Sequence, residues 1–551
     1  NLGLRYEYLS LPRDAQLQAL NSIADVPGLI EFRVPKTDKN NFAPRVGLAY
    51  SPEFGGRIGR LISGKRGQSS FRANFSISYY ETFQNLYLLN LPPQFQQEQS
   101  AAVLGLTANF LQNGGVPPTP IPPNTIEDAR GATASFITDA VQPYNMAWTL
   151  SYQRELTPGT LLELRYLHTA GRHLPVQVRL NGGVVDNSRL VIPTFLTNPT
   201  AGQLAGRPTL GDVGLDIVRD ENGDVVANNR FPARLGSSGF AGSVTSFEPE
   251  GNSVYDAGSV SITRRFANRF AFTGAYTWSK AIDNATNELF SSTVNPRRGQ
   301  DAFDLRNERS LSAIDVPHRF VASLNYETPA FRKYNGFVRS LLGGWQVSGI
   351  FQTQSGQLIT PQSGIDSNRD RDAAGDRTIL NPNGTPGTGT GVFPVDINGN
   401  RLTVTEGGVT RFVDASEGDS RTAAYVALNP NAEYIQAGLG ARANAGRNTL
   451  RTNGWNRTDA VFLKNFRFGG EGRYTFQFGA EVGNLFNQRI RTIGDYGSPF
   501  FVNQNDQNGT NQFGIGAVSF AFPDVTSPNF NDYSVGNFSG RTIQLRTKFI
   551  F

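Results

Sequence analysis

The sequence predicts an all-β protein, a transmembrane antiparallel β-barrel of which about twelve strands lie in this chain. Three observations lead to this prediction. Segments of about ten residues alternate between apolar and polar side chains, and long and short connections alternate between those segments. No run reaches the roughly 18 consecutive apolar residues of a membrane-spanning helix. A membrane protein without such a helix must cross as a barrel, because in lipid every backbone polar group has to be hydrogen-bonded within the protein.

The last segment, residues 540–551, shows the alternation most clearly. Its intervening polar positions include Arg546 and Lys548, and a period of two over this length predicts an extended strand with one apolar side. A terminal aromatic residue in such a strand resembles the C-terminal assembly signal of bacterial outer-membrane β-barrels, and an ordinary terminal strand of a soluble sheet is the alternative. The residues of this assembly signal are Ile543, Leu545, Phe549 and Phe551.

Eleven earlier segments share the pattern and are expected to be strands. They are residues 1–9, 45–50, 71–80, 146–152, 162–166, 254–266, 270–278, 318–327, 345–352, 455–468 and 474–486. Segment 455–468 is the least regular, and we expect a β-bulge there.

The connections alternate in length without exception. The long ones are residues 10–44, 82–143, 169–253, 281–317, 354–454 and 487–539, and the short ones are 51–70, 157–159, 267–269, 328–344 and 469–472. Outer-membrane barrels have short periplasmic turns and longer extracellular loops, whereas a soluble sandwich or propeller has no reason to place every long loop at one end. The pattern therefore predicts extracellular long loops and a periplasmic C-terminus.

The polar face of each strand is expected to line the lumen, because an Arg facing lipid near the bilayer midplane costs roughly 2 to 4 kcal/mol. We expect these charged residues to pair with each other or with a plug more often than to contact substrate. The lumen-facing candidates are Arg5, Glu7, Arg72, Glu163, Arg165, Glu481, Arg546 and Lys548.

Five stretches look like the barrel half of TonB-dependent outer-membrane receptors and are most similar to the Oar-like group. They are residues 40–52 (NNFAPRVGLAYSP), 255–283, 315–327 (DVPHRFVASLNYE), 344–360 and 478–487 (FGAEVGNLFN). The resemblance implies a barrel of about 22 strands, plugged by an N-terminal domain and coupled to TonB at the inner membrane. Residues 1–551 would then be the barrel domain, supplying its last twelve strands. No plug or TonB box is recognisable in these residues, and we expect the true N-terminus to lie upstream.

The wide barrel and large loops imply energised transport of a bulky solute such as a metal chelate, a glycan or a peptide. The expected partners are outer-membrane lipid, the plug, TonB and an unknown bulky ligand. Two alternatives stay open: a surface adhesion, assembly or protein-export barrel of the Oar-like type, and a passive channel complete with twelve strands. The solute and the direction of transport do not follow from the sequence.

Composition and motifs argue against other classes. The net charge is +5 without a block of like charge, so no nucleic-acid partner is expected. The absence of Cys excludes disulfides and thiolate metal sites. No Ser/His/Asp arrangement stands out, and we expect no enzymatic activity.

One loop carries acidic residues at the spacing of a calcium-binding loop. Oxygen-bearing side chains recur at alternate positions, as hard-cation loops require, but the Gly and the terminal Glu of an EF-hand are replaced by Arg371 and Arg377. A solvated Asp/Arg loop is the alternative. The candidate calcium ligands are Asp366, Asn368, Asp370, Asp372 and Asp376.

Overall fold

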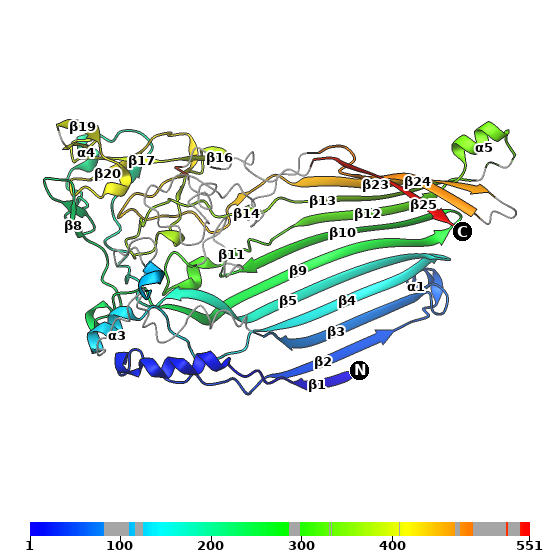
Figure 1. Ribbon diagram of the computed structural model, residues 1–551, viewed down its shortest axis with the longest axis horizontal. Helices are drawn as coiled ribbons and strands as arrows, with labels where there is room; N and C mark the ends of the chain where they lie inside the picture. Colours follow the sequence, from blue (N-terminus) through cyan, green and yellow to red (C-terminus); the bar gives the residue numbers. More distant parts are fainter. Residues whose placement is uncertain are drawn as a thin grey trace.

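A single long antiparallel sheet dominates the chain, and its strands run side by side along the long axis of the molecule (Figure 1). The computed structural model describes residues 1–81, 110–115, 125–285, 298–329, 331, 333–406, 408–468, 474–488, 525–526, 530 and 540–551. Within these residues each strand of the sheet pairs with the next in sequence order, apart from the short strands of the connections. The sheet is thus an up-and-down meander.

Twelve described strands form this meander, and together they account for every segment that the alternation predicts. They are β1 (Leu2–Tyr6), β2 (Phe42–Tyr50), β3 (Ser69–Tyr79), β4 (Tyr144–Thr157), β5 (Thr160–Arg179), β9 (Thr245–Ala267), β10 (Phe270–Asp283), β12 (His318–Glu327), β13 (Trp345–Gln354), β23 (Trp455–Phe468), β24 (Tyr474–Gly483) and β25 (Thr542–Ile550). The prediction of an all-β chain of antiparallel strands is confirmed.

Tight turns join the strands at one end of the sheet. Residues 268–269 connect β9 to β10, and both Asn268 (φ 51°) and Arg269 (φ 70°) are left-handed. Positive φ at both central residues is the requirement of a two-residue hairpin turn whose twist matches that of the strands. The turn between β4 and β5 instead contains Gly159 at φ 79°.

The predicted bulge in segment 455–468 is wrong. Strand β23 pairs with β13 and with β24 without a register shift. Its pattern is irregular because Lys464 lies on the apolar face, opposite Trp345 and Phe478. The Lys464 ammonium is buried and donates to the carbonyl oxygens of Ser340 and Gly343, at the end of helix α5 (Gly336–Leu342). The irregular pattern therefore reflects side chains that depart from the two faces, such as Lys464 on the apolar face and Leu463 on the polar face, and not a backbone irregularity.

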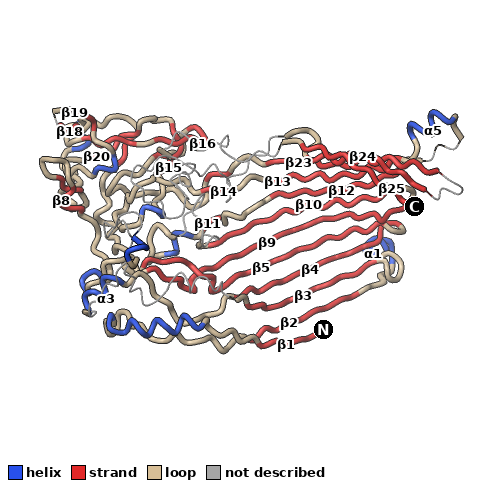
Figure 2. The backbone as a smooth tube through the Cα atoms, viewed as in Figure 1, coloured by secondary structure: helices blue, strands red, loops and turns tan. Residues whose placement is uncertain are grey.

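The long connections gather at one end of the sheet and the short ones at the other, as Figure 2 shows. Helix α1 (Gly56–Ser63) and helix α5 lie at the short-connection end, where both chain termini are also found (Figure 1). The remaining described elements belong to the long connections. They are η1 (Arg13–Ala24), η2 (Phe110–Asn113), α3 (Ile126–Ala132), β6 (Thr194–Phe195), α4 (Ala201–Leu204), β7 (Ile217–Arg219), β8 (Val225–Asn228), η3 (Gly236–Ser238), η4 (Leu305–Glu308), β11 (Ser310–Leu311), β14 (Leu358–Ile359), η5 (Ala373–Gly375), β15 (Ile379–Leu380), β16 (Thr385–Thr390), β17 (Val392–Val395), β18 (Thr403–Glu406), β19 (Val409–Phe412), η6 (Ala415–Glu417), β20 (Ala424–Ala427), β21 (Ala432–Ile435) and β22 (Leu450–Arg451).

The hydrophobic core lies in these connections and not between layers of the main sheet. One cluster joins residues 180–244 to residues 355–454, with Leu210, Phe231 and Tyr425 almost fully buried. A second cluster joins three connections through Phe32, Ala129 and Val244 and their neighbours. We call this packed set of long connections the loop assembly. Along the strands, by contrast, large apolar side chains are exposed, which is typical of a sheet whose outer face meets lipid.

Strands β1 and β25 form the two edges of the sheet. Among the described residues β1 pairs with β2 alone and β25 with β24 alone. Each edge therefore presents a row of backbone N–H and C=O groups for pairing. No described helix is long and apolar enough to cross a bilayer.

Candidate functional site

The strand pairing separates charged and apolar side chains onto opposite faces of the sheet. Residues directly opposite in an antiparallel ladder point to the same side. One row across six strands reads Arg72, Ser151, Arg165, Ser259, Thr277 and Arg319. A nearby row, on the other face, reads Tyr152, Leu164, Val260, Tyr276 and Phe320. The sheet thus has one polar face and one apolar face across most of its width.

The strand registers place seven of the eight charged residues predicted to line the lumen on the polar face, and the eighth, Glu7, follows β1 and pairs with Arg5. Six of them form ion pairs on that face, and the pairs are Arg5 with Glu7 (3.0 Å), Arg165 with Glu163 (2.5 Å) and Arg546 with Glu481 (2.5 Å). Arg72 lies opposite Ser151, and Lys548 opposite Gln477. Mutual pairing is therefore the main role that the geometry gives these charges.

The C-terminal strand follows the same division. In β25, Leu545 lies opposite Ala480 and Phe549 opposite Phe476. The four residues of the assembly signal have 51 to 90 % of their surface exposed, so their apolar side chains are available to lipid. Aromatic rings also gather near the turns. Phe71 and Tyr152 are 4.9 Å apart between ring centroids, as in the interfacial girdle of a membrane barrel.

The loop assembly is held together by buried ion pairs as well as by its core. Carboxylates from residues 283–315 bind arginines from residues 377–451, and the pairs are Asp283 with Arg447, Glu308 with Arg377 (2.8 Å) and Asp315 with Arg451 (2.5 Å). The parallel pairing of β6 with β20 adds a backbone link between two connections. These pairs were not predicted from the sequence, because no local pattern identifies the partners.

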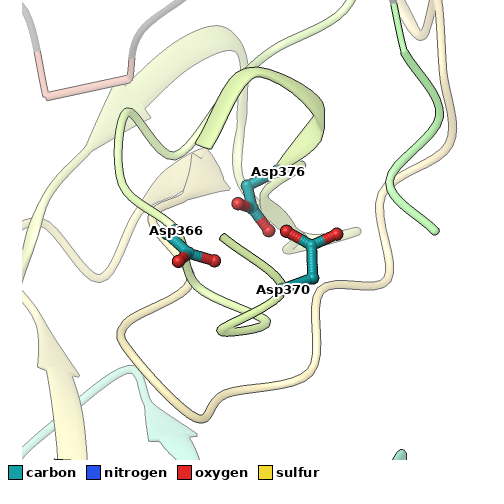
Figure 3. A group of neighbouring side chains, drawn as sticks. All are labelled: Asp366, Asp370 and Asp376. Atoms are coloured by element: carbon teal, nitrogen blue, oxygen red, sulfur yellow. The ribbon is translucent and has the colours of Figure 1, made fainter. Parts of the chain in front are cut away.

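Three of the predicted calcium ligands converge in the loop assembly. The carboxylate oxygens of Asp366, Asp370 and Asp376 lie within 4.8 Å of one another, and Figure 3 shows the three side chains facing a common centre. Asp376 is fully buried, and Asp370 is 6 % exposed. One oxygen of Asp376, Oδ1, accepts hydrogen bonds from the Ser367 hydroxyl (2.9 Å) and from the Asn368 backbone N–H (3.3 Å).

The other two predicted ligands are engaged elsewhere. The side-chain oxygen of Asn368 accepts the backbone N–H of Asp370 (3.0 Å). The carboxylate of Asp372 binds the guanidinium of Arg298 and lies 3.3 Å from that of Arg179. The structure therefore brings together three of the five residues.

Two residues of this segment have left-handed backbone conformations. Arg371 occupies the sixth position, where an EF-hand has Gly, and its φ is 77°. Arg369 is also left-handed, at φ 61°. The turn that glycine normally permits is therefore made by arginine residues, whose side chains bind neighbouring connections.

Burial and mutual repulsion perturb the three carboxylates. Burial, followed by the charges of Asp366 and Asp372, raises the pKa of Asp370 to about 8. Burial also raises the pKa of Asp376 well above its ordinary value, and Asp370 and Asp366 add to the effect. The pKa of Asp366 is raised by burial, against the lowering influence of Arg369. Two buried carboxylates and one half-buried carboxylate this close together require a compensating positive charge to be ionised together.

Comparison with known proteins places the chain in a family. A family model described as an outer membrane beta barrel domain matches residues 1–526. A search of curated proteins found no match.

Several solved structures show weak similarity to the chain. They include the outer membrane transporter YddB from Escherichia coli (7% identity, 82% of this chain, 38% of that chain, TM-score 0.33). A mutant of the ferric enterobactin receptor PfeA from Pseudomonas aeruginosa, in complex with enterobactin, gives 11% identity over 93% of this chain and 41% of that chain, with a TM-score of 0.34. The FrpB iron transporter from Neisseria meningitidis gives 10% identity, 82% and 35% coverage and a TM-score of 0.31. The chain thus spans less than half the length of each of these proteins. On the strength of the family model, this chain is a member of the outer membrane beta-barrel domain family.

Proposed function

We propose that the chain is part of the wall of a TonB-dependent outer-membrane transporter for a bulky solute, such as a metal chelate, a glycan or a peptide. The observation that carries this proposal is the loop assembly. Its connections fold into one packed body with its own core at a single end of the sheet, far beyond what joining neighbouring strands requires. A rigid body of this kind suits a ligand platform above a barrel.

The orientation follows from the same asymmetry. Long loops of outer-membrane barrels face the exterior and short turns face the periplasm. The loop assembly is therefore extracellular, and Phe551 is periplasmic. Protease added to intact cells is expected to cut exposed sites of the loop assembly, and to cut the α1 and α5 connections only after the outer membrane is opened. Cleavage of the α1 connection in intact cells would reverse the orientation.

The two edges of the sheet must be paired in the membrane. An unpaired edge leaves backbone polar groups in hydrocarbon, each at a cost of several kcal/mol. We infer that further strands separate β25 from β1, as in a wide transporter barrel, whereas a passive channel of twelve strands would pair them directly.

Because the chain contains no native cysteine, this point is testable by disulfide scanning. Cysteine pairs placed across β1 and β25 at every register are expected to stay uncrosslinked in the assembled protein. A pair across β2 and β3, at Gly47 and Asn74, is the control that should crosslink, because these residues are register partners. Efficient β1–β25 crosslinking would favour the passive channel.

Transport itself is tested in the bacterium that encodes the chain. Uptake of iron chelates, oligosaccharides and peptides is compared among the parent strain, a strain lacking this protein and a strain lacking TonB. The expected result is loss of uptake of the same solute in both mutants. Uptake that is normal in both mutants for every solute class would refute the proposal. Surface adhesion that depends on the protein but not on TonB would support the second candidate, an adhesion or assembly barrel of the Oar-like type, for which the folded body at the loop end is also suited.

A further inference from the structure

We propose that Asp366, Asp370 and Asp376 bind one hard divalent cation, with Ca²⁺ as the expected ion, and that this ion holds three long connections together. The inference concerns the loop assembly and does not depend on what the barrel transports. We call residues 366–377 the acidic hub.

Asp370 and Asp376 lack the cationic partners that neighbouring carboxylates have, and Asp366 has only a long ion pair. Asp283, Glu308, Asp315 and Asp372 each bind an arginine guanidinium. In the described part of the chain no ion pair involves Asp370 or Asp376, and the nearest cation to Asp366 is Arg230, at 3.9 Å. Buried charges in proteins are paired or bind metal, so the cluster has the composition of a cation site.

The cluster also contains carboxylate oxygens without hydrogen-bond partners. Among the described residues, Oδ2 of the fully buried Asp376 and Oδ1 of Asp366 have no hydrogen-bond partner. A buried carboxylate oxygen left without a donor is costly unless something else satisfies it. Both residues face the common centre of the cluster in Figure 3, which is where a cation would lie.

The arginines within the acidic hub form no ion pair with Asp366, Asp370 or Asp376, although the charge of Arg369 acts on Asp366. The guanidinium of Arg369 donates to the carbonyl oxygen of Asn229, that of Arg371 to the carbonyl oxygen of Phe231, and that of Arg377 to Glu308. These side chains are used to attach the hub to its neighbours. The described arginines thus leave Asp370 and Asp376 without an ion pair, and a bound cation would supply the missing positive charge.

The donor set and its spacing select the kind of ion. Two oxygens bound to one Ca²⁺, each at about 2.4 Å, lie at most about 4.8 Å apart, and the three carboxylates meet this condition. The cluster offers oxygen ligands without His or Cys, which favours Ca²⁺ or Mg²⁺ over zinc or copper. Ca²⁺ accepts irregular coordination, whereas Mg²⁺ demands near-octahedral geometry.

The acidic hub also contacts two other long connections directly. The backbone carbonyl oxygen of Asp370 accepts a hydrogen bond from the N–H of Gly183 (2.8 Å), and that of Arg369 accepts one from the N–H of Phe231 (3.1 Å). The Asn368 side chain donates to the carbonyl oxygen of Gln300 (2.7 Å). A side chain at position 183 would meet the Asp370 backbone at 3.0 to 3.2 Å, so Gly183 permits this close contact. An ion that neutralises the hub therefore stabilises connections 180–244 and 284–317 together with its own.

Binding is measured on the full-length protein in detergent after removal of metal with a chelator. Equilibrium dialysis against radioactive calcium is expected to show one site with a dissociation constant of about 0.1 to 1 mM, the range of extracellular calcium modules, and Mg²⁺ should compete weakly. Asp370→Asn and Asp376→Asn should each weaken binding at least about tenfold. Asp396→Asn is the matched control, because Asp396 is a loop carboxylate that accepts backbone N–H bonds outside the cluster. Absence of binding at about 10 mM Ca²⁺, or unchanged affinity in both hub variants, would overturn the proposal.

A second measurement separates ion binding from a purely structural role. Without Ca²⁺, Asp376→Asn removes the charge repulsion between position 376 and the neighbouring carboxylates, and the amide oxygen can still accept the hydrogen bonds from Ser367 and Asn368. Limited proteolysis of the loop assembly should therefore be slower in the variant than in the wild type. With Ca²⁺ the order reverses, because only the wild type gains protection. Faster proteolysis of the variant under both conditions, with no effect of Ca²⁺ on the wild type, would also overturn the proposal.

Discussion

Replacing Val260 by arginine tests which face of the sheet meets lipid. Val260 lies on the apolar face of β9, between Leu164 and Tyr276 on the neighbouring strands. The next residue, Ser261, lies on the polar face, opposite Glu163. Val260→Arg and Ser261→Arg therefore introduce the same side chain into the same strand at nearly the same depth, on opposite faces.

The expected difference follows from the position of Val260 in the strand. Val260 precedes the end of β9 at Ala267 by seven residues, which corresponds to about 24 Å along the strand. A tilt of about 40° converts this length to a height of roughly 18 Å above the turn, inside an apolar band about 25 Å tall. Arginine on the lipid face at such depth costs about 2 to 4 kcal/mol, or a factor of about 30 to 700 in the folding equilibrium. Ser261→Arg gains a cross-strand partner in Glu163, so its effect should stay within about 1 kcal/mol.

The assay is equilibrium folding of the full-length protein into phosphatidylcholine vesicles across a denaturant series, followed by tryptophan fluorescence. Val260→Arg should lower the transition midpoint, and Ser261→Arg should leave it nearly unchanged. Equal shifts in the two variants, or a larger shift for Ser261→Arg, would refute the assignment of the apolar face to lipid.

Three further predictions concern contacts made by individual charged side chains. Arg447→Ala leaves the buried carboxylate of Asp283 without its partner and should destabilise the loop assembly by about 3 to 5 kcal/mol. The measurement is the loss of hydrogen-exchange protection in the loop assembly, and unchanged protection would contradict the pairing. Lys464→Met removes the hydrogen-bond donor at the C-terminus of α5 and should lower the hydrogen-exchange protection of that helix by about 1 to 2 kcal/mol. Unchanged protection of the helix would show that other contacts stabilise it. Hydrogen bonds from Arg33 lower the pKa of Asp139 below its ordinary value of 3.8. The pair therefore stabilises the protein at pH values above 3.8, and this stabilisation is lost as the pH falls through the lowered pKa. Protease sensitivity of residues 7–41 should therefore rise below about pH 4 in the wild type but not in Asp139→Asn, and an identical acid response in both would exclude this pair as its cause.

The strands were predictable because a period of two is a local property of the sequence. Residues such as Val260 and Ser261 reveal their faces by alternation alone, and the registers then follow from tight turns. Strand β23 misled the sequence analysis because the partner of Lys464 is a helix end that lies more than one hundred residues away. Pattern reasoning within a strand has no access to such a contact.

The acidic hub shows the same limit within a candidate site. The alternating oxygen-bearing side chains drew attention to this segment, because hard cations favour that spacing, and three of the five predicted ligands converge in the structure. The sequence did not reveal that Asp372 pairs with Arg298, 74 residues earlier. It also gave no sign that arginine at position 371 would adopt the turn expected of glycine. Which carboxylates converge is decided by tertiary contacts between connections, and these have no periodic signature.

The location of the hydrophobic core has a consequence for the order of folding. The hairpins of the main sheet that are closed by short connections join nearby residues, so their loop-closure entropy is small. The core of the loop assembly brings together residues as distant as Ala24 and Val244, and Ile359 meets Val525. The loop-closure entropy of such distant contacts falls once the strands have fixed the two ends of each connection. We therefore expect the loop assembly to consolidate last, after the main sheet has formed.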